Sequence, residues 1–137
     1  MRRVLAFLLL ALLAAPQAAR ADNDIRQEAI RFAPGASKAT IKGTITGPQT
    51  IDYQLRTAAG QTMTVAFKPS NPSTYFNVLP PGSEDALFIG SSSGNDFKGV
   101  LPAAGLHTIR VFLMRNAARR NETSHYTLDV SVTGGNR

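Results

Sequence analysis

The sequence predicts an all-β protein, an antiparallel β-sandwich of about eight to nine short strands. Three observations lead to this prediction. Apolar and polar residues alternate along most of the chain, and turn residues recur about every ten positions. The sequence also lacks an amphipathic segment long enough for a three-turn helix. At 137 residues, the chain has the length of a single domain.

The first 21 residues are predicted to be a secretory signal peptide rather than part of the fold. Two arginines at positions 2 and 3 precede an apolar run over residues 4–15, which is short for a bilayer span of about 20 residues. The small residues Ala19 and Ala21 then mark a cleavage site. We expect one mature domain, residues 22–137, exported to the periplasm and no longer attached to a membrane.

The net charge and the absence of cysteine limit the functions that the chain can have. The formal charge of +6, from 15 basic and 9 acidic residues, first suggests a nucleic acid or a membrane as partner. Cleavage of the signal peptide would remove three arginines and no acid, which leaves +3. The absence of cysteine excludes disulfides, thiolate metal sites and thiol catalysis, and it is compatible with a bacterial periplasm.

The strands are predicted in chain order from the alternation of apolar and polar residues. The first is expected at 28–32, and regular alternation marks 38–46, 51–56 and 62–68. Weaker patterns predict strands at 74–78, 87–89 and 97–101, of which the apolar run 87–89 is typical of a strand buried on both faces. Alternation then returns at 109–114 and 126–132. Turns rich in Gly, Pro, Asn and Ser separate these segments.

Catalytic and metal-binding patterns are weak, so the sequence predicts no enzyme, no metal and no cofactor. Residues Gly90–Gly94 match G-x-S-x-G in letters, but we expect a Ser/Gly-rich loop without the helix that a nucleophile elbow needs. His107 and His125 begin two strands and are interpreted as ordinary strand-edge residues. The adjacent acids Glu84 and Asp85 would point to opposite sides of an extended chain, so they cannot face one substrate together.

The segment between the last two strands is unusually basic. Arg115, Arg119 and Arg120, together with Arg110, are four of the twelve basic residues of the mature chain. Guanidinium groups bind carboxylates in a bidentate manner and dehydrate more easily than ammonium groups, which suits a protein interface. The alternatives are a solvated loop that serves solubility and a nucleic-acid site. Aromatic stacking residues are not interleaved with the arginines, which disfavours the nucleic-acid site.

An ordered set of short motifs resembles the bacterial periplasmic inhibitors of goose-type (g-type) lysozyme, over residues 30–132. The motifs that match are Ile-Lys-Gly-Thr-Ile-Thr-Gly at 41–47, Tyr53, Ala-Gly-Gln at 59–61, Leu-Pro-Ala-Ala-Gly at 101–105, Ile-Arg-Val at 109–111, Arg-Asn-Ala-Ala-Arg at 115–119, Asn121 and Tyr126. The turn and sandwich motifs are also similar to the wider prepeptidase C-terminal group of β-sandwiches.

The resemblance implies a host lysozyme of the g-type as the partner, and an arginine loop that enters its substrate cleft. Carried over by position, Arg115 and Arg119 are the residues that enter. We expect Asn116, Arg120 and Gln49 to join them in partner binding. The family can place an aromatic residue after the glycine that matches Gly47, where this sequence has Pro-Gln-Thr at 48–50.

A non-catalytic module that binds the cell wall or another polysaccharide is the alternative function. Such modules present exposed aromatic rings that stack on sugars. This chain has no tryptophan, and its three tyrosines, Tyr53, Tyr75 and Tyr126, lie in strand patterns where packing accounts for them. The inhibitor is therefore the favoured interpretation.

Overall fold

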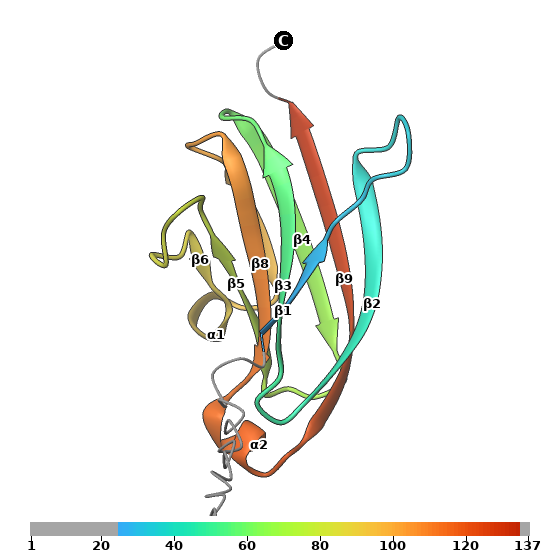
Figure 1. Ribbon diagram of the computed structural model, residues 1–137, viewed down its shortest axis with the longest axis vertical. Coiled ribbons are helices and arrows are strands. Elements are labelled where there is room, and N and C mark those ends of the chain that lie inside the picture. Colours follow the sequence, from blue (N-terminus) through green and yellow to red (C-terminus); the bar gives the residue numbers. More distant parts are fainter. Residues whose placement is uncertain (1–24, 135–137) are drawn as a thin grey trace, which may run out of the picture.

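The structure is a computed structural model that describes residues 25–134. Two β-sheets pack face to face over a single apolar core (Figure 1). The first, sheet A, contains, in spatial order, β1 (Ile25–Ala29), β3 (Thr50–Thr57), β8 (Gly105–Leu113), β5 (Thr74–Leu79) and β6 (Phe88–Ile89). The second, sheet B, contains β2 (Lys38–Thr46), β9 (Thr123–Gly134), β4 (Gln61–Pro69) and β7 (Asp96–Val100). The predicted all-β sandwich is confirmed.

The core follows from the period-two pattern, because alternate residues of a strand point to opposite faces of the sheet. Ile51, Tyr53 and Leu55 of β3 are buried, as are Met63, Val65 and Phe67 of β4. Register partners in neighbouring strands share the inward direction, as Tyr53 and Ile109 do. The alternation in the sequence therefore identifies the inner faces of both sheets.

Two tyrosines link the sheets across the core. The hydroxyl groups of Tyr53 in β3 and Tyr126 in β9 are hydrogen-bonded at 2.5 Å, and both side chains are buried. Gly43 in β2 makes room for this pair, because a Cβ atom there would lie 2.4 Å from the Tyr126 hydroxyl. Burial raises the pKa of both tyrosines, so the pair stays protonated.

Three details of the predicted strands need correction. The first strand lies at Ile25–Ala29 rather than 28–32, and it pairs with β3 in parallel, the exception in an otherwise antiparallel sheet A. The run 87–89 is not buried on both faces. Its strand, β6, has one partner, β5, and lies at the sheet edge, so Leu87 is 38% and Ile89 47% exposed. The strand expected at 97–101 spans Asp96–Val100.

Two short helical turns interrupt the strands. The first, α1 (Gly90–Ser93), replaces part of the expected Ser/Gly-rich loop. A Cβ atom on Gly90 would lie 2.3 Å from the Phe76 carbonyl oxygen, so glycine allows this turn to pack on β5. The second turn, α2 (Arg115–Arg119), is the helical turn that the arginine spacing assumed, and it joins β8 to β9. No helix within residues 25–134 is long and apolar enough to cross a membrane.

His107 also departs from expectation. The strand-edge interpretation is wrong, because its side chain is fully buried on the inner face of β8. Its Nδ1 atom is hydrogen-bonded to Thr57 Oγ1 at 2.8 Å, whereas Nε2 has no partner among the described residues. The predicted signal peptide, residues 1–21, lies outside the described residues and stays a prediction.

Candidate functional site

The arginine segment, which we define as residues 115–122, covers one end of the sandwich (Figure 1). Its helical turn α2 is fixed at both its start and its middle. The Met114 amide donates a 2.8 Å hydrogen bond to the Ser73 carbonyl, and Ala117 is fully buried against the core. Because alanine has a short side chain, α2 lies close to the sandwich while its longer neighbours point outward.

The β2–β3 turn lies directly beside the arginine segment. The Gly47 amide donates a 2.9 Å hydrogen bond to the Glu122 carbonyl. A Cβ atom on Gly47, which has a φ of +60°, would lie 2.3 Å from Asn121 Oδ1. Asn121 itself has a φ of +57°, a left-handed conformation that asparagine tolerates. The turn that contains Gln49 and the segment that contains the arginines therefore form one continuous surface.

Glu122 fixes one of the three arginines. Its carboxylate accepts a 2.9 Å hydrogen bond from Asn71 Nδ2 and a 2.7 Å hydrogen bond from Arg120 Nε. These donors, Asn71 first and Arg120 second, lower the pKa of Glu122. Arg120 therefore has an intramolecular carboxylate partner and braces the segment.

Arg115 and Arg119 remain exposed, and neither forms an ion pair with any residue in the described range 25–134. They are four residues apart on a helical turn, and such positions are neighbours on one face. Two guanidinium groups are thus available to a partner at the end of the molecule. No shielding carboxylate from the described part of the chain competes for them.

The other two predicted site residues are partly engaged within the protein. Gln49 is exposed, and its Oε1 atom accepts a 2.9 Å hydrogen bond from the Thr46 amide, which closes the β2–β3 turn. Asn116 is exposed, and its Oδ1 atom accepts a 3.0 Å hydrogen bond from the Ala117 amide. The structure brings all five predicted residues to one end of the sandwich. It leaves Arg115 and Arg119 as the pair with unengaged charges.

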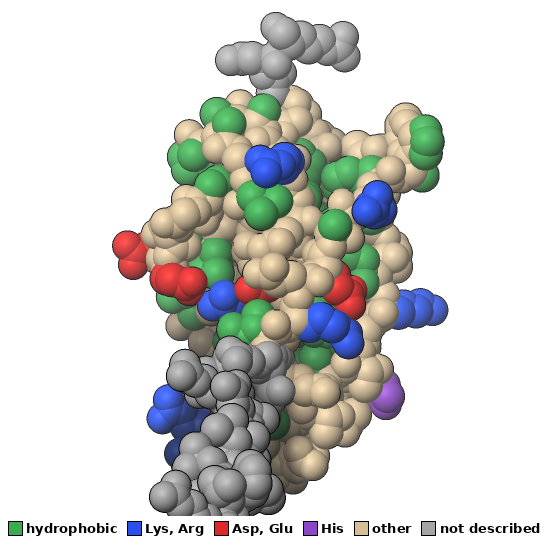
Figure 2. All heavy atoms as spheres, viewed as in Figure 1, with side chains coloured by type: hydrophobic (Ala, Val, Ile, Leu, Met, Phe, Trp, Pro, Cys, Tyr) green, Lys and Arg blue, Asp and Glu red, His purple; other side chains and the backbone are tan. Residues whose placement is uncertain are grey.

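Arg110 does not join this surface, although the sequence groups it with the other arginines. Its Nε and NH2 atoms donate to the two oxygens of Asp52 at 2.8 and 2.9 Å, and NH1 contacts Glu84 at 3.1 Å. Figure 2 shows basic and acidic side chains side by side on this face of the molecule, the outer face of sheet A. Arg110 is a structural cation of that face.

Sequence reasoning missed Asn71 and Glu122, which position the arginine segment. Asn71 lies in the turn between β4 and β5, 51 residues from Glu122, and no local pattern connects the two. Their hydrogen bond depends on β4 and β9 being neighbours in sheet B, which the sequence did not reveal. Within residues 25–134, no cluster of three or more His, Asp and Glu residues could hold a metal ion.

Comparisons with known proteins identify relatives of this chain. No family model matches the chain. A curated protein of Escherichia coli (strain K12), an inhibitor of g-type lysozyme, is 32% identical over 130 residues, which cover 93% of each chain.

Two solved structures are also similar. The periplasmic inhibitor of g-type lysozyme from Aeromonas hydrophila has 39% identity and a TM-score of 0.74, over 80% of this chain and 97% of that one. The pre-peptidase C-terminal domain of a Bacillus anthracis collagenase has 15% identity and a TM-score of 0.51, over 80% and 94%, and it shows the fold alone. Since the curated relative is an inhibitor and the match spans nearly all of both chains, this chain belongs to the family of periplasmic, non-enzymatic inhibitors of g-type lysozyme.

Proposed function

We propose that the protein inhibits a host lysozyme of the g-type by placing the arginine segment in the substrate cleft of that enzyme. The proposal extends to this chain the activity for which its relatives from Escherichia coli and Aeromonas hydrophila are named. The observation that carries the mechanism is the division of the arginines. Arg120 is paired with Glu122, whereas Arg115 and Arg119 are exposed and have no carboxylate partner among the described residues.

The chemistry of the target fits this arrangement. A glycoside hydrolase of the lysozyme kind has a catalytic carboxyl group in a cleft that holds a polysaccharide. A guanidinium group can bind such a carboxylate through two parallel hydrogen bonds. Arg115 would pair with the catalytic carboxyl and Arg119 with an acidic or carbonyl group of the cleft wall. Entry of the sugar chain would then be blocked sterically, and the cell wall of the bacterium would be protected.

Contacts with the sandwich hold the arginine segment in one position before it binds. The segment is held by the buried Ala117, by the Met114 amide and by the hydrogen bond from Asn71 to Glu122. A pre-ordered segment loses less conformational entropy on binding than a loose loop does. Gln49, beside it, would contact the rim of the cleft from the β2–β3 turn.

The alternative, a polysaccharide-binding module that stacks sugars on aromatic rings, finds no support. Tyr53 and Tyr126 are buried. Tyr75 is half-buried and packs against Phe112, with ring centroids 6.4 Å apart. No tyrosine is left as an open stacking platform.

An inhibition panel tests the proposed function. The purified mature protein is titrated against lysozymes of the goose, chicken and invertebrate types, and hydrolysis of bacterial cell walls is measured. We expect inhibition of the goose type at the lowest concentration. Binding to peptidoglycan without inhibition of any of the three enzymes would contradict the proposal.

A further inference from the structure

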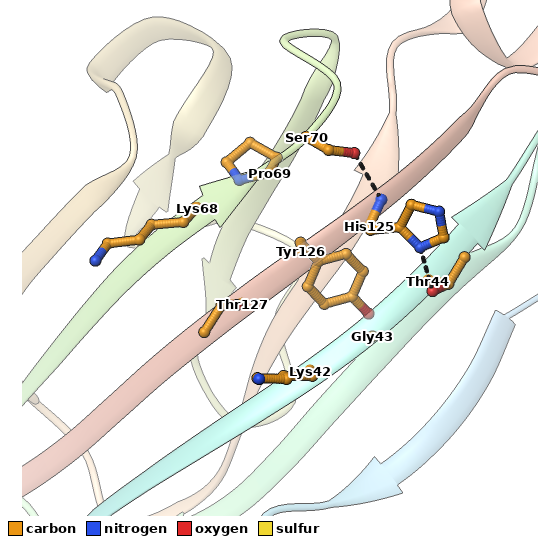
Figure 3. Close-up of a pocket in the computed structure, with 9 residues that line it drawn as sticks. All are labelled: Lys42, Gly43, Thr44, Lys68, Pro69, Ser70, His125, Tyr126 and Thr127. Atoms are coloured by element: carbon orange, nitrogen blue, oxygen red, sulfur yellow. Dashed lines mark hydrogen bonds between the residues drawn. The ribbon is translucent and has the colours of Figure 1, made fainter.

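The outer face of sheet B, which points away from sheet A, has a hollow. It has a volume of about 560 Å³ and is lined by residues of β2, β4 and β9 and by the chain that follows β4 (Figure 3). Its charged or titratable lining residues are Lys42, Lys68 and His125, together with Tyr126, whose side chain is buried. The hollow belongs to no part of the arginine segment.

The sheet register explains why the two lysines converge. Lys42 of β2 and Lys68 of β4 are both register partners of Thr127 in the central strand β9. Neighbouring strands are about 4.8 Å apart, so the two lysine Cα atoms lie roughly 10 Å apart across one short threonine. Figure 3 shows both lysine side chains extending in the same direction on either side of β9. A short side chain between two long ones creates the hollow.

No acidic side chain of residues 25–134 lines this hollow. Lys42 and Lys68 are exposed, and neither forms an ion pair with a residue in the range 25–134. The acid next along the outer face of β9 is Asp129, whose Oδ1 atom accepts a 2.6 Å hydrogen bond from Thr40. The hollow therefore presents two ammonium groups to solvent.

The remaining lining is polar and ordered. Thr44 Oγ1 and His125 Nδ1 are hydrogen-bonded at 2.9 Å, and the His125 amide donates a 2.9 Å hydrogen bond to Ser70 Oγ. Both contacts are visible in Figure 3. They fix the imidazole ring at one end of the hollow, opposite the two ammonium groups. Hydroxyl groups and an imidazole can donate to or accept from amide and hydroxyl groups of a ligand.

We propose that this hollow binds carboxylate groups of the bacterial cell wall, so that the protein docks on peptidoglycan through sheet B. Peptidoglycan is the carboxylate-bearing polymer of the compartment in which this family resides, and its stem peptides repeat acidic groups along the polymer. Ion pairs at an exposed site are individually weak, but a repeating polymer lets many sites be sampled.

An anionic membrane surface fits less well. The large exposed apolar side chains of the described residues are Ile25, Leu87, Ile89, Val100 and Met114, and none of them lines the hollow. Peripheral membrane binding usually combines basic residues with inserted apolar ones. A hollow lined by hydroxyl groups and lysines fits a hydrated polymer better.

The docking is independent of lysozyme inhibition, because it uses no residue of the arginine segment. Docking on the wall would retain the inhibitor on the polymer that lysozyme attacks. This docking differs from that of a sugar-stacking module, because the hollow would bind carboxylate groups and not sugar rings.

Co-sedimentation with purified peptidoglycan sacculi tests the proposal. We expect the wild-type protein to sediment with sacculi, and the double variant Lys42→Gln/Lys68→Gln to bind about tenfold more weakly. Thr127→Glu keeps both lysines but supplies an internal carboxylate between them, and we expect the same loss. The control double variant Arg56→Gln/Lys98→Gln removes equal charge outside the hollow and is expected to bind as the wild type does.

Two further arms identify the ligand. Sacculi whose carboxyl groups have been converted to neutral amides should lose the wild-type protein, and vesicles containing phosphatidylglycerol should bind it no better than neutral vesicles. All variants are expected to inhibit g-type lysozyme as the wild type does. No binding to sacculi, equal loss in the control variant, undiminished binding to amidated sacculi or preferential binding to the anionic vesicles would each overturn the proposal.

Discussion

Arg110 and Arg115 are five residues apart and differ in their ion-pair partners among the described residues. Arg110 binds Asp52 in a bidentate manner on the outer face of sheet A, and Asp52 is only 4% exposed. The hydrogen bonds and the charge of Asp52 raise the pKa of Arg110, so its guanidinium group stays charged. Arg115 has no such partner in the described chain. We therefore expect identical side chains to serve stability in one place and recognition in the other.

This division predicts opposite effects of two substitutions. Arg110→Met leaves the carboxylate of Asp52 nearly buried and unpaired, so we expect a loss of about 2–4 kcal/mol in the free energy of unfolding. Inhibition by the fraction that stays folded should persist. Arg56→Met, at an exposed position on the same sheet, is the control and should change stability by less than about 0.5 kcal/mol. Urea unfolding measures both, and equal effects would show that the ion pair contributes nothing.

His107 makes the stability depend on pH. Burial lowers its pKa below the usual value of 6.5, against a smaller opposing effect of the Gly105 carbonyl. As the pH falls below about 6.5, the unfolded chain binds a proton at this residue that the folded chain does not bind. We therefore expect the free energy of unfolding to fall by up to about 1 kcal/mol between pH 7.5 and pH 5.5.

The variant His107→Gln isolates this effect. It removes the titrating group, so its free energy of unfolding should change less over the same pH range, as measured by urea unfolding at each pH. His125→Gln, at the other histidine, leaves His107 in place and is the matched control. If the pH dependence of His107→Gln equalled that of the wild type, the buried imidazole would not be its source.

At the scale of elements, the position of α2 depends on a buried residue, Ala117, and not only on the exposed arginines. Ala117 is fully buried and holds the turn against the end of the sandwich. Replacing it by leucine would overpack this contact, at a cost of about 1–3 kcal/mol. The displaced turn would also misplace Arg115 and Arg119.

We therefore expect Ala117→Leu to lower both the unfolding midpoint and the inhibition of g-type lysozyme. Ala103→Leu, in the exposed turn between β7 and β8, is the control and should change neither. The two measurements are made on the same preparations. Normal inhibition by a folded Ala117→Leu protein would mean that the position of α2 is not important.

The strands show how far local patterns reach. The alternation over 38–46, 51–56 and 62–68 located β2, β3 and β4, because each has one face in the core and one in solvent. The same logic failed for 87–89, where an apolar run lies at a sheet edge, and for β1, whose parallel pairing with β3 depends on distant residues. The alternation of apolar and polar residues indicates which face of a strand is apolar, but it does not indicate which strand lies beside it.

The candidate site was predictable to the same degree. The density of arginines at 115–120 and the family motifs located the segment and its helical turn. The contact from Asn71 to Glu122, which holds the carboxylate that pairs with Arg120, required the pairing of β4 with β9. Chemistry local to one segment was visible in the sequence, whereas partners supplied by another strand were not.

At the scale of the whole molecule, the position of charge matters more than its sum. The total of +6 includes three arginines of the predicted signal peptide. Arg115 and Arg119, which have no ion-pair partner among the described residues, lie at one end of the sandwich. Lys42 and Lys68 of the hollow lie on the outer face of sheet B. The proposed lysozyme and peptidoglycan contacts therefore use different residues.

Local attraction at the arginine end predicts a salt dependence. Exposed charges are screened over about 10 Å at 0.1 M salt. Raising the salt concentration from about 0.05 to 0.5 M should therefore weaken lysozyme binding several-fold, as measured by isothermal titration calorimetry. The double variant Arg115→Ala/Arg119→Ala should show a clearly smaller dependence. If lysozyme binding by the wild type and by the double variant depended equally on salt, the charges that attract lysozyme would lie outside Arg115 and Arg119.

The central claim is that Arg115 and Arg119 enter the lysozyme cleft, and the inhibition constant of Arg115→Ala for a g-type lysozyme tests it most directly. If Arg115 is a hot spot of the interface, its removal should cost about 2–4 kcal/mol of binding, which corresponds to roughly 30- to 1000-fold weaker inhibition. Its unfolding midpoint should stay that of the wild type, since the side chain is exposed and unpaired within the described chain. An unchanged inhibition constant would contradict the account.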